Sequence, residues 1–307
     1  MEPSTGPLSD RVVAITGAGN GLGRAYAHAA AAAGASVIVA DVDLPSAQSV
    51  ADQIIARGRG AAAVEVDISR PGAGELIVSA ARTHFGRLDG LVANAGILSP
   101  GPLLDQSPET VHRTIGVNVE GTISTVTAAA RAMDDGGSIV VIVSGSMLGA
   151  DGLALYGTTK AAALGLVYGL ALELADTGVR INGLAPRART GMSEQMGAAG
   201  EDKGGPAERV APAVVYLLAD DSRALQGHVL RFDGEHLAVF RPPRIAQEVS
   251  APDWDATAIA AAMAGPLRDE IGSSLPGATR RGGADATDVL HLRTADSSKR
   301  LGAEWSG

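Results

Sequence analysis

The sequence predicts an α/β protein with a doubly wound fold, in which helices cover both faces of a seven-stranded parallel sheet. Short β-branched runs alternate with Ala-rich segments of helical periodicity along residues 1–240. The β-branched runs are apolar throughout, as is typical of parallel strands that are buried on both faces. A glycine-rich turn also joins the first run to the first helical segment. Strands that alternate with helices in this way form a parallel sheet with helical crossovers.

The boundaries of these elements follow from the change between periodicities of 2 and 3.6 residues. We expect strands at Val12–Thr16, Ser36–Ala40, Ala63–Asp67, Gly90–Ala93, Ser138–Ser144, Arg180–Leu184 and Gly227–Phe232. Helical patterns lie between them, near 22–33, 45–57, 73–85, 108–132, 153–176 and 206–219.

The pattern changes near residue 240, so we expect one domain over residues 1–240 and a partly irregular C-terminal extension over 241–307. Arg241-Pro242-Pro243 interrupts regular structure, and residues 253–264 favour one more helix. From Gly265 the chain is polar and shows little periodicity. This tail is either draped on the surface or partly disordered, or it is an arm that packs on a neighbouring subunit.

Composition and charge exclude several classes of function. Hydrophobic residues make up 46% of the chain and aromatic residues only 3%, which predicts a core of Ala, Val, Ile and Leu. The formal net charge of −9 argues against nucleic acid as a partner, because a phosphate backbone requires a basic surface. The chain has no cysteine, which excludes disulfides and thiolate chemistry, and its scattered histidines predict no metal site.

The N-terminal region predicts neither secretion nor a membrane anchor. The first eleven residues are polar and acidic, unlike a signal peptide. The apolar stretch Ala25–Ala40 is interrupted by His28 and Gly34, so it is better explained as a helix followed by a strand. We therefore expect a soluble cytoplasmic protein without membrane contact.

Residues Thr16–Gly23, with the sequence TGAGNGLG, lie where the first strand meets the first helix. Glycines at such a turn allow a tight bend, close approach of the backbone to a pyrophosphate, and close packing of helix on strand. The helix N-terminus would then face the phosphates. We expect a Rossmann-type dinucleotide site that includes Gly17, Asn20, Gly21 and Leu22.

Polar residues at the ends of the next strands extend this site. Asp41 ends the second strand, where a carboxylate accepts hydrogen bonds from ribose hydroxyls and repels a 2′-phosphate. Because no Arg or Lys follows it, Asp41 favours NAD over NADP; alternatively it caps the next helix. Asp67, followed by Ile68, is placed to reach the adenine or is a simple turn residue. The small residues of Asn94-Ala95-Gly96 leave room for the cofactor.

Tyr156 and Lys160 are four residues apart, so both lie on one face of a helix. A free tyrosine titrates near a pKa of about 10, and a neighbouring ammonium favours the phenolate. We therefore expect Lys160 to lower the pKa of Tyr156 toward the range that acid–base catalysis uses.

Taken together, T-G-x-x-x-G-x-G at Thr16–Gly23, N-A-G at 94–96 and Y-x-x-x-K at 156–160 resemble the short-chain dehydrogenases/reductases, over roughly residues 10–235. The resemblance implies a catalytic set. Tyr156 exchanges a proton with the substrate oxygen, and Lys160 also holds the ribose of the nicotinamide. Ser144 donates a hydrogen bond to the substrate oxygen, while Asn118 kinks its helix and holds a water in a proton relay.

Two positions allow alternatives within this resemblance. Ser144 and Ser146 compete for the same role, and counting from the strand start favours Ser144, with Ser146 further into the substrate loop. After the sixth strand the family has Pro-Gly, whereas this chain has Pro186-Arg187. Thr190 still matches the family residue at the cofactor, as does Pro186.

A finer resemblance links GLGRAYA at 21–27 and RINGLAP at 180–186 to the dehydrogenase part of multifunctional peroxisomal β-oxidation enzymes and their bacterial relatives. It implies oxidation of 3-hydroxyacyl-CoA or hydroxysteroid-like substrates. Arg187 and Arg189 would then serve a CoA phosphate, or they are solvated surface charges. We expect residues 191–200 to form a short lid with glycine hinges.

The resulting hypothesis is an NAD-dependent dehydrogenase that acts on a secondary alcohol. The alternatives are a dehydrogenase for another small alcohol or natural-product intermediate, or an NAD(H)-binding sensor without turnover. The resemblance also implies a homotetramer or homodimer that associates through helices near 108–132 and 153–176.

Overall fold

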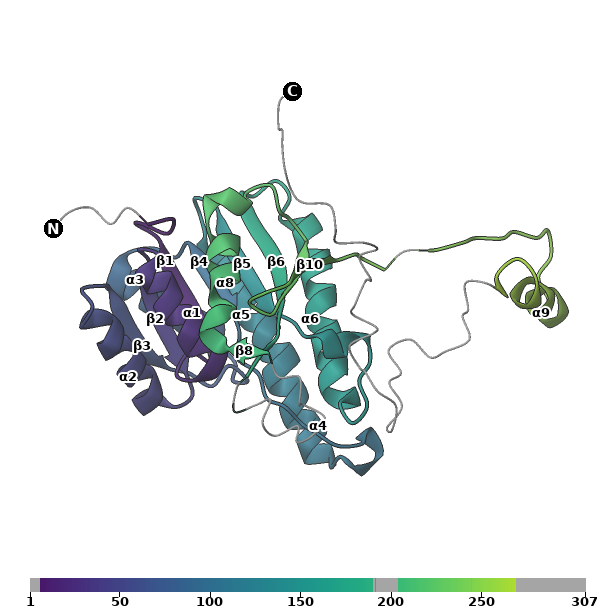
Figure 1. The fold of residues 1–307 in the computed structure, drawn as a ribbon, viewed down its shortest axis with the longest axis horizontal. Helices are drawn as coiled ribbons and strands as arrows, with labels where there is room; N and C mark the ends of the chain where they lie inside the picture. The colour runs from purple at the N-terminus through teal and green to yellow at the C-terminus, as the bar shows by residue number, and fades with distance from the viewer. Residues whose placement is uncertain (1–5, 190, 192–203, 244, 269–307) are drawn as a thin grey trace, which may run out of the picture.

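The computed structural model describes residues 6–189, 191, 204–243 and 245–268. At its centre is an eight-stranded sheet with the order β10-β9-β6-β5-β4-β1-β2-β3 (Figure 1). The strands are β1 Val12–Thr16, β2 Ser36–Asp41, β3 Ala61–Glu65, β4 Gly90–Ala93, β5 Gly137–Ile142, β6 Val179–Pro186, β9 Val229–Phe232 and β10 Leu237–Phe240. A separate parallel pair consists of β7 Ala188–Arg189 and β8 Gly205–Pro206.

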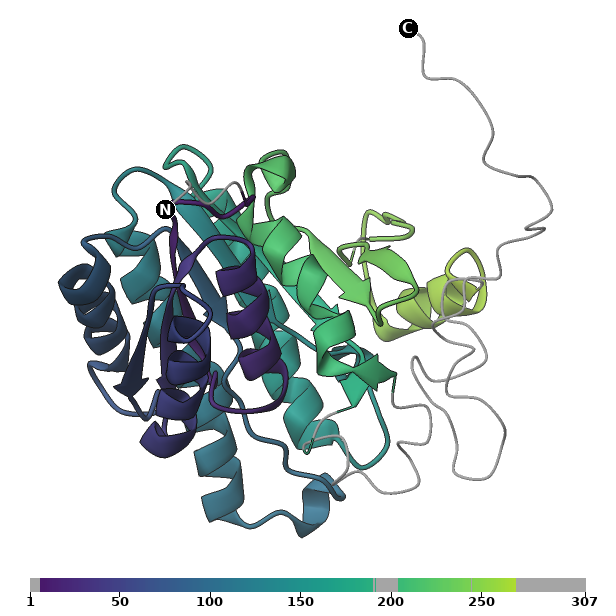
Figure 2. The same cartoon turned by 60° about the vertical axis from the view of Figure 1, so that its left-hand side comes forward.

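Helices cover both faces of this sheet, so the predicted doubly wound α/β fold is confirmed (Figures 1 and 2). One face carries α1 Gly21–Ala32, α2 Leu44–Ile55 and α8 Ala211–Leu218. The opposite face carries α3 Ala73–Phe85, α5 Thr122–Ala132 and α6 Ala154–Glu173. Helix α4, Pro108–Ile115, runs into α5 through a π-helical turn at Gly116–Gly121. Short 3₁₀ turns lie at Leu103–Asp105, Gly145–Leu148, Ala207–Arg209 and Asp220–Ser222.

The pleat of each strand explains why its sequence is apolar throughout. In β1, Val13 and Ile15 pack with α1, α2 and α8, whereas Val12 and Ala14 pack with α3, α5 and α6. Successive side chains of a strand point to opposite faces, and here each face is a core. The sheet therefore separates two apolar layers.

The predicted number of strands is wrong by one, because the sheet has an eighth, antiparallel strand. β10 returns along β9, with Leu237 opposite Phe232 and Phe240 opposite Val229. A tight turn reverses the chain: Asp233 Oδ1 accepts hydrogen bonds from the backbone N–H of Glu235 (2.9 Å) and of His236 (2.7 Å). This strand needs no helical crossover, so the alternation that revealed the other seven gives no signal for it.

The helix predicted within the C-terminal extension is confirmed as α9, Ala256–Ala264, with Asp255 as its N-cap. Asp255 Oδ1 accepts a hydrogen bond of 2.7 Å from Ala258 N. No residue of α9 is buried, and the helix stands apart from the sheet (Figures 1 and 2). The boundary between domain and extension at residue 240 stays a prediction. Within the described ranges, every helix is too short or too polar to span a bilayer.

Asp89 joins the start of β1 to the start of β4. Its Oδ2 accepts a hydrogen bond of 2.8 Å from Val12 N, and its own N–H donates to Val12 O at 2.9 Å. The carboxylate is buried and also receives the guanidinium of Arg87. Loss of this carboxylate would leave a buried N–H of β1 without its acceptor.

We therefore expect Asp89→Ala to lower the free energy of unfolding by about 2 kcal/mol, the cost of one unsatisfied buried donor. Asp134→Ala is the matched control, because Asp134 also pairs with an arginine, Arg82, but is exposed. It should cost less than about 1 kcal/mol. Chemical denaturation measures both, and equal losses would contradict the role assigned to Asp89.

Candidate active site

The residues predicted for the site gather at the carboxyl ends of the strands, where the strand order reverses. β1 lies between β4 and β2, so consecutive crossovers run to opposite sides of it. Gly17 follows β1, Asp41 ends β2, Asn94 follows β4 and Ser144 lies just beyond β5. In open α/β sheets this reversal leaves a crevice that binds ligands.

Thr16 and Asn94 join the two motifs that the sequence assigns to a cofactor. Thr16 Oγ1 accepts hydrogen bonds from the N–H groups of Asn94 and Ala95, both at 3.0 Å. In return, Asn94 Nδ2 donates to Thr16 O at 2.9 Å and to Gly17 O at 3.2 Å. Gly17 has a φ of +62°, and a Cβ there would lie 2.9 Å from Ala95 Cα. The two turns are thus a single hydrogen-bonded unit.

The N-terminus of α1 has the features that a pyrophosphate requires. Asn20, its N-cap, makes no capping hydrogen bond through its side chain, and the first turn contains no acidic residue. Asn20 and Gly21 are exposed and Leu22 is half-buried. At α4, by contrast, Ser107 Oγ accepts from Thr110 N and caps the helix. The N–H groups at the start of α1 therefore fit an anionic ligand.

Asp41 holds the glycine-rich turn from the neighbouring strand. Its Oδ2 accepts a hydrogen bond of 2.8 Å from Gly19 N, and its Oδ1 accepts one of 3.0 Å from Asp43 N. The N-cap of α2 is Asp43, so the alternative that Asp41 caps this helix is not supported. The hydrogen bond to Gly19 was not predicted, because the spacing of the motif gives no sign of a contact between Asp41 and the turn.

Asp67 lies two residues beyond the end of β3, at the start of the third crossover. Its Oδ1 accepts hydrogen bonds from Ser69 N (3.0 Å) and Ser69 Oγ (2.6 Å), which hold the pKa of the carboxyl below its usual value. Arg70 pairs with Oδ2 at 3.4 Å. The next residue, Ile68, is buried and packs against Gly121 of the π-helical turn, where a Cβ would lie 2.7 Å from Ile68 O.

Asn118 lies within the π-helical turn and ties three elements together. Its Oδ1 accepts from Ile97 N at 2.8 Å, and its Nδ2 donates to Ile97 O at 2.9 Å. Nδ2 also donates to Thr159 Oγ1 at 3.1 Å, and Thr159 Oγ1 donates to Tyr156 O at 2.8 Å. No motif of the sequence singles out Thr159, which is buried in α6 and connects Asn118 to the helix of Tyr156.

Tyr156 and Lys160 share one face of α6, with Lys160 Nζ 5.7 Å from the centre of the tyrosine ring. The ammonium is buried and donates a hydrogen bond of 2.7 Å to Ile142 O, at the end of β5. Burial lowers the pKa of Lys160 to about 8. Burial also raises the pKa of Tyr156 to about 12, and a hydrogen bond with Ser144 opposes this rise. The expected lowering of the Tyr156 pKa by Lys160 is therefore wrong, because desolvation of the phenol is the largest effect and only the hydrogen bond with Ser144 acts against it.

Ser144 and Ser146 contact each other rather than pointing to separate places. Ser144 is the N-cap of the 3₁₀ turn Gly145–Leu148, and its Oγ accepts from Ser146 N (3.3 Å) and Ser146 Oγ (3.0 Å). Gly157 brings α6 against this turn, because a Cβ there would lie 2.5 Å from Ser146 O. The glycine of the Y-G-T-T-K sequence thus allows the tyrosine helix and the serine turn to meet.

The segment after β6 is described only in part. Pro186 ends β6, and Arg187 N donates a hydrogen bond of 2.9 Å to Phe232 O. The side chain of Arg187 is half-buried and that of Arg189 is exposed. Thr190 and the predicted lid, apart from Gly191, lie outside the described residues.

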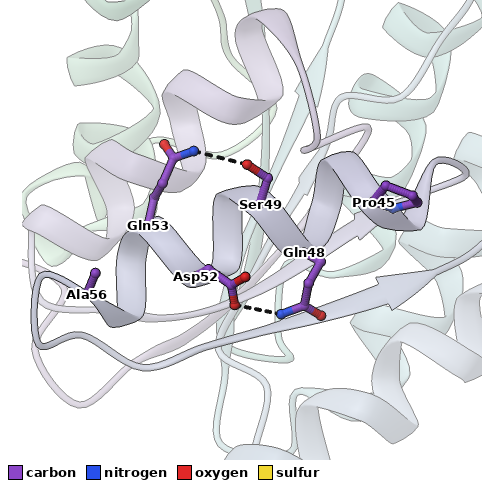
Figure 3. Close-up of a pocket in the computed structure, with 6 residues that line it drawn as sticks. All are labelled: Pro45, Gln48, Ser49, Asp52, Gln53 and Ala56. Atoms are coloured by element: carbon purple, nitrogen blue, oxygen red, sulfur yellow. Dashed lines mark hydrogen bonds between the residues drawn. The ribbon is translucent and has the colours of Figure 1, made fainter.

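A shallow surface groove on α2 is unrelated to these residues (Figure 3). It is lined by Pro45, Gln48, Ser49, Asp52, Gln53 and Ala56. Its polar side chains pair along the helix, Gln48 with Asp52 at 2.8 Å and Gln53 with Ser49 at 3.2 Å. None of the residues predicted for the site lines it, so it is a feature of the helix surface.

A doubly wound sheet with a glycine-rich turn at its switch point and a Tyr–Lys pair beside it defines a Rossmann-type oxidoreductase. Residues 11–199 match the family described as short chain dehydrogenase. The crystal structure of a short chain dehydrogenase from Mycobacterium avium superposes with a TM-score of 0.76 at 30% identity, covering 86% of this chain and 95% of that one. The chain belongs to the short-chain dehydrogenase family.

Two relatives with named activities are similar over most of their length. An L-rhamnose 1-dehydrogenase (NAD(P)(+)) from Azotobacter vinelandii is 34% identical, covering 74% of this chain and 96% of the relative. A (2S)-[(R)-hydroxy(phenyl)methyl]succinyl-CoA dehydrogenase subunit from Thauera aromatica is 32% identical, covering 73% of this chain and 95% of the relative. Both are oxidoreductases, as the family implies for this chain.

The buried Lys160 predicts a dependence of stability on pH. Its pKa in the folded protein is about 8, below the ordinary value of 10.5. Between these values the unfolded chain binds more protons than the folded one, so stability rises with pH. Below about pH 8 both states carry the charge, and the full cost of burying it is present.

Lys160→Met lacks this titration, so we expect the unfolding free energy of the wild type to rise relative to the variant between about pH 8 and pH 10.5. The relative gain should approach about 3 kcal/mol. Chemical denaturation at a series of pH values measures it. A difference between the two proteins that stays constant with pH would show that Lys160 is not desolvated.

Proposed function

We propose that the protein is an NAD(H)-dependent oxidoreductase that interconverts a secondary alcohol and a ketone. The observation that carries the proposal is the Tyr156–Lys160 pair on α6, with Ser144 beside the phenol at the carboxyl end of β5. When bound, the nicotinamide would accept or supply the hydride. The protein would orient the substrate and move the proton.

The proposed roles follow from the chemistry of each group. Tyr156 exchanges a proton with the substrate oxygen, and Ser144 donates a hydrogen bond to that oxygen. Lys160 supplies the positive charge that favours the phenolate, and with Tyr156 it would hold the ribose of the nicotinamide. Asn118 would hold the water of a proton relay to Lys160. Both Nδ2 protons of its side chain are engaged, by Ile97 O and Thr159 Oγ1, and we propose that the water meets its backbone.

The proposed cofactor site uses the turn and strand ends described above. The uncapped start of α1 would receive the pyrophosphate, and Asp41 would bind the ribose hydroxyls of the adenosine half. A carboxylate at this position repels a 2′-phosphate, which supports NAD over NADP. The remaining residues that would surround the cofactor are Asp67, Ile68, Asn94, Ala95, Gly96, Pro186 and Thr190.

For the substrate we propose a 3-hydroxyacyl-CoA or a hydroxysteroid-like alcohol. The Thauera aromatica relative, whose name specifies a CoA thioester, supports the first of these. Arg187 and Arg189 follow β6 at the same edge of the sheet and would meet an anionic substrate group. An alternative substrate is a small polyol or another small alcohol, and the rhamnose dehydrogenase supports this alternative. A different function, that of a sensor that binds NAD(H) without turnover, is the remaining alternative.

We propose a homodimer or homotetramer in the cytoplasm. Helix α6 has apolar residues around its whole circumference, and Ala161, Ala162 and Leu172 on its outer side are exposed. A helix that is apolar on every side is usually covered on every side, which supports a contact between subunits through α6. Its burial against the sheet accounts for only one side.

The proposal predicts the behaviour of Tyr156→Phe, which removes the exchangeable proton and little else. We expect turnover to fall at least about 100-fold, the usual contribution of a general acid or base. Formation of reduced nicotinamide with NAD, across 3-hydroxyacyl-CoAs, hydroxysteroids, sugars and simple secondary alcohols, measures the activity. Binding of NADH, followed by fluorescence, should weaken by no more than about tenfold, the loss of one hydrogen bond to the ribose. Undiminished NADH binding without turnover of any alcohol by the wild type would favour the sensor.

The cofactor preference predicts the behaviour of Asp41→Asn, which keeps an acceptor for Gly19 N but removes the charge. We expect the ratio of kcat/KM with NAD to kcat/KM with NADP to fall at least about tenfold, because repulsion of a 2′-phosphate is lost. Asp43→Asn, at an exposed neighbour, is the matched control and should leave the ratio unchanged. An equal loss with both cofactors would mean that Asp41 only supports the turn.

A further inference from the structure

The oxygen of Ser144 is occupied as an acceptor by one residue. Ser146 donates to it twice, through its backbone N–H at 3.3 Å and through its hydroxyl at 3.0 Å. A hydroxyl group has two lone pairs and a single proton. With both lone pairs engaged by Ser146, the proton of the Ser144 hydroxyl is left to donate, and a hydrogen bond from Ser144 lowers the pKa of the neighbouring Tyr156.

The backbone fixes Ser146 in this position. Met147 N donates to Ser144 O at 3.1 Å, and Gly149 N donates to Ser146 O at 3.0 Å, which closes the 3₁₀ turn. On its other side, Gly157 of α6 approaches so closely that no Cβ would fit beside Ser146 O. The turn is therefore held from both sides, and the Ser146 hydroxyl lies on Ser144 rather than on an open surface.

We propose that Ser146 is a positioning residue of the proposed dehydrogenase, which acts through Ser144 by orienting its hydroxyl as a donor toward Tyr156. The inference rests on the proposed function, and it replaces the expectation that the two serines compete for one substrate oxygen. When Tyr156 has lost its proton, two aligned hydroxyls point toward the phenolate and stabilise it. When Tyr156 is protonated, its neutral oxygen accepts more weakly from Ser144, so the same orientation of the two hydroxyls favours the phenolate.

The surroundings of Tyr156 leave few other groups that would dominate its titration. Lys160, one turn further along α6, is the charged side chain that faces its ring. The neighbouring elements contribute neutral polar groups in the part that the structure describes. They are the Ile142 carbonyl from β5, Asn118 from the π-helical turn and the two serines.

The inference predicts that Ser146→Ala raises the apparent pKa in the pH profile of kcat/KM for alcohol oxidation by about one unit. A shift of this size corresponds to one ordinary hydrogen bond. Because oxidation needs the deprotonated tyrosine, the profile moves to higher pH. Ser146→Thr keeps the hydroxyl and should restore the wild-type profile. The Kd of NADH should stay within about twofold, since no serine is placed at the nucleotide.

A double-mutant cycle separates action through Ser144 from an independent role. Ser144→Ala removes the direct donor, so adding Ser146→Ala to it should have almost no further effect on the apparent pKa. Additive shifts would overturn the inference. So would a Ser146→Ala variant with an unchanged pH profile and a raised KM, which would identify Ser146 as a substrate contact.

A readout without substrate keeps this test separate from the proposed function. Ultraviolet titration of the NAD-saturated protein reports the tyrosine ionisations, and subtraction of the Tyr156→Phe variant isolates the phenol at position 156. Ser146→Ala should again raise its pKa by about one unit. If the wild type oxidises no alcohol, the proposed function fails, but this titration still decides whether Ser146 acts on Tyr156.

Discussion

The hydroxyl of Thr16 is the constraint on which the rest of the site depends. By accepting from Asn94 N and Ala95 N, it fixes the turn after β4 against the turn after β1. Ile97, just beyond that turn, is held by Asn118, and Asn118 is held in turn by Thr159 of α6. The nucleotide motif and the Tyr–Lys helix, far apart in the sequence, are thus connected by a short series of part-buried and buried hydrogen bonds. In a buried network each missing partner is costly, which keeps such an arrangement rigid.

The Tyr–Lys pair on α6 is buried, and this burial has an electrostatic cost. Burial lowers the pKa of Lys160 and raises that of Tyr156, so the protein alone favours the neutral form of both. The positive charge that would activate the phenol is therefore destabilised by the same desolvation that makes it effective. Two groups reduce this cost: the Ile142 carbonyl, which accepts from the ammonium, and the Ser144 hydroxyl, which bonds to the phenol. The site is thus built around charges that its own interior disfavours, as is common at functional sites.

Much of the fold could be predicted from the sequence because each core strand is buried on both faces. Val12–Thr16 and Gly90–Ala93 have the predicted boundaries, since an apolar run has sharp ends where it meets glycine or polar residues. β10 is not predicted, because it returns antiparallel to β9 through a tight turn and needs no helical crossover. Within the site, residue types and spacing indicated Tyr156 and Lys160. Contacts that depend on side-chain direction, such as Asp41 with Gly19 or Ser146 with Ser144, cannot be predicted from the spacing of residues in the sequence. The pKa of Tyr156 cannot be predicted from spacing either, because it depends on how deeply the phenol is buried.

Arg187 stands where the short-chain dehydrogenases have the glycine of a Pro-Gly pair, and the backbone at this position explains why an arginine is tolerated. Glycine is required where φ is positive or where a Cβ would clash. Among the described residues other than glycine, only Asp10 has a positive φ, so the backbone of Arg187 is unstrained. The N–H of Arg187 continues the β6–β9 pairing by donating to Phe232 O. The glycine that a close contact requires here is Gly204, where a Cβ would lie 2.4 Å from Arg187 O. The arginine therefore adds a long cationic side chain just after β6 without disturbing the strand that carries it.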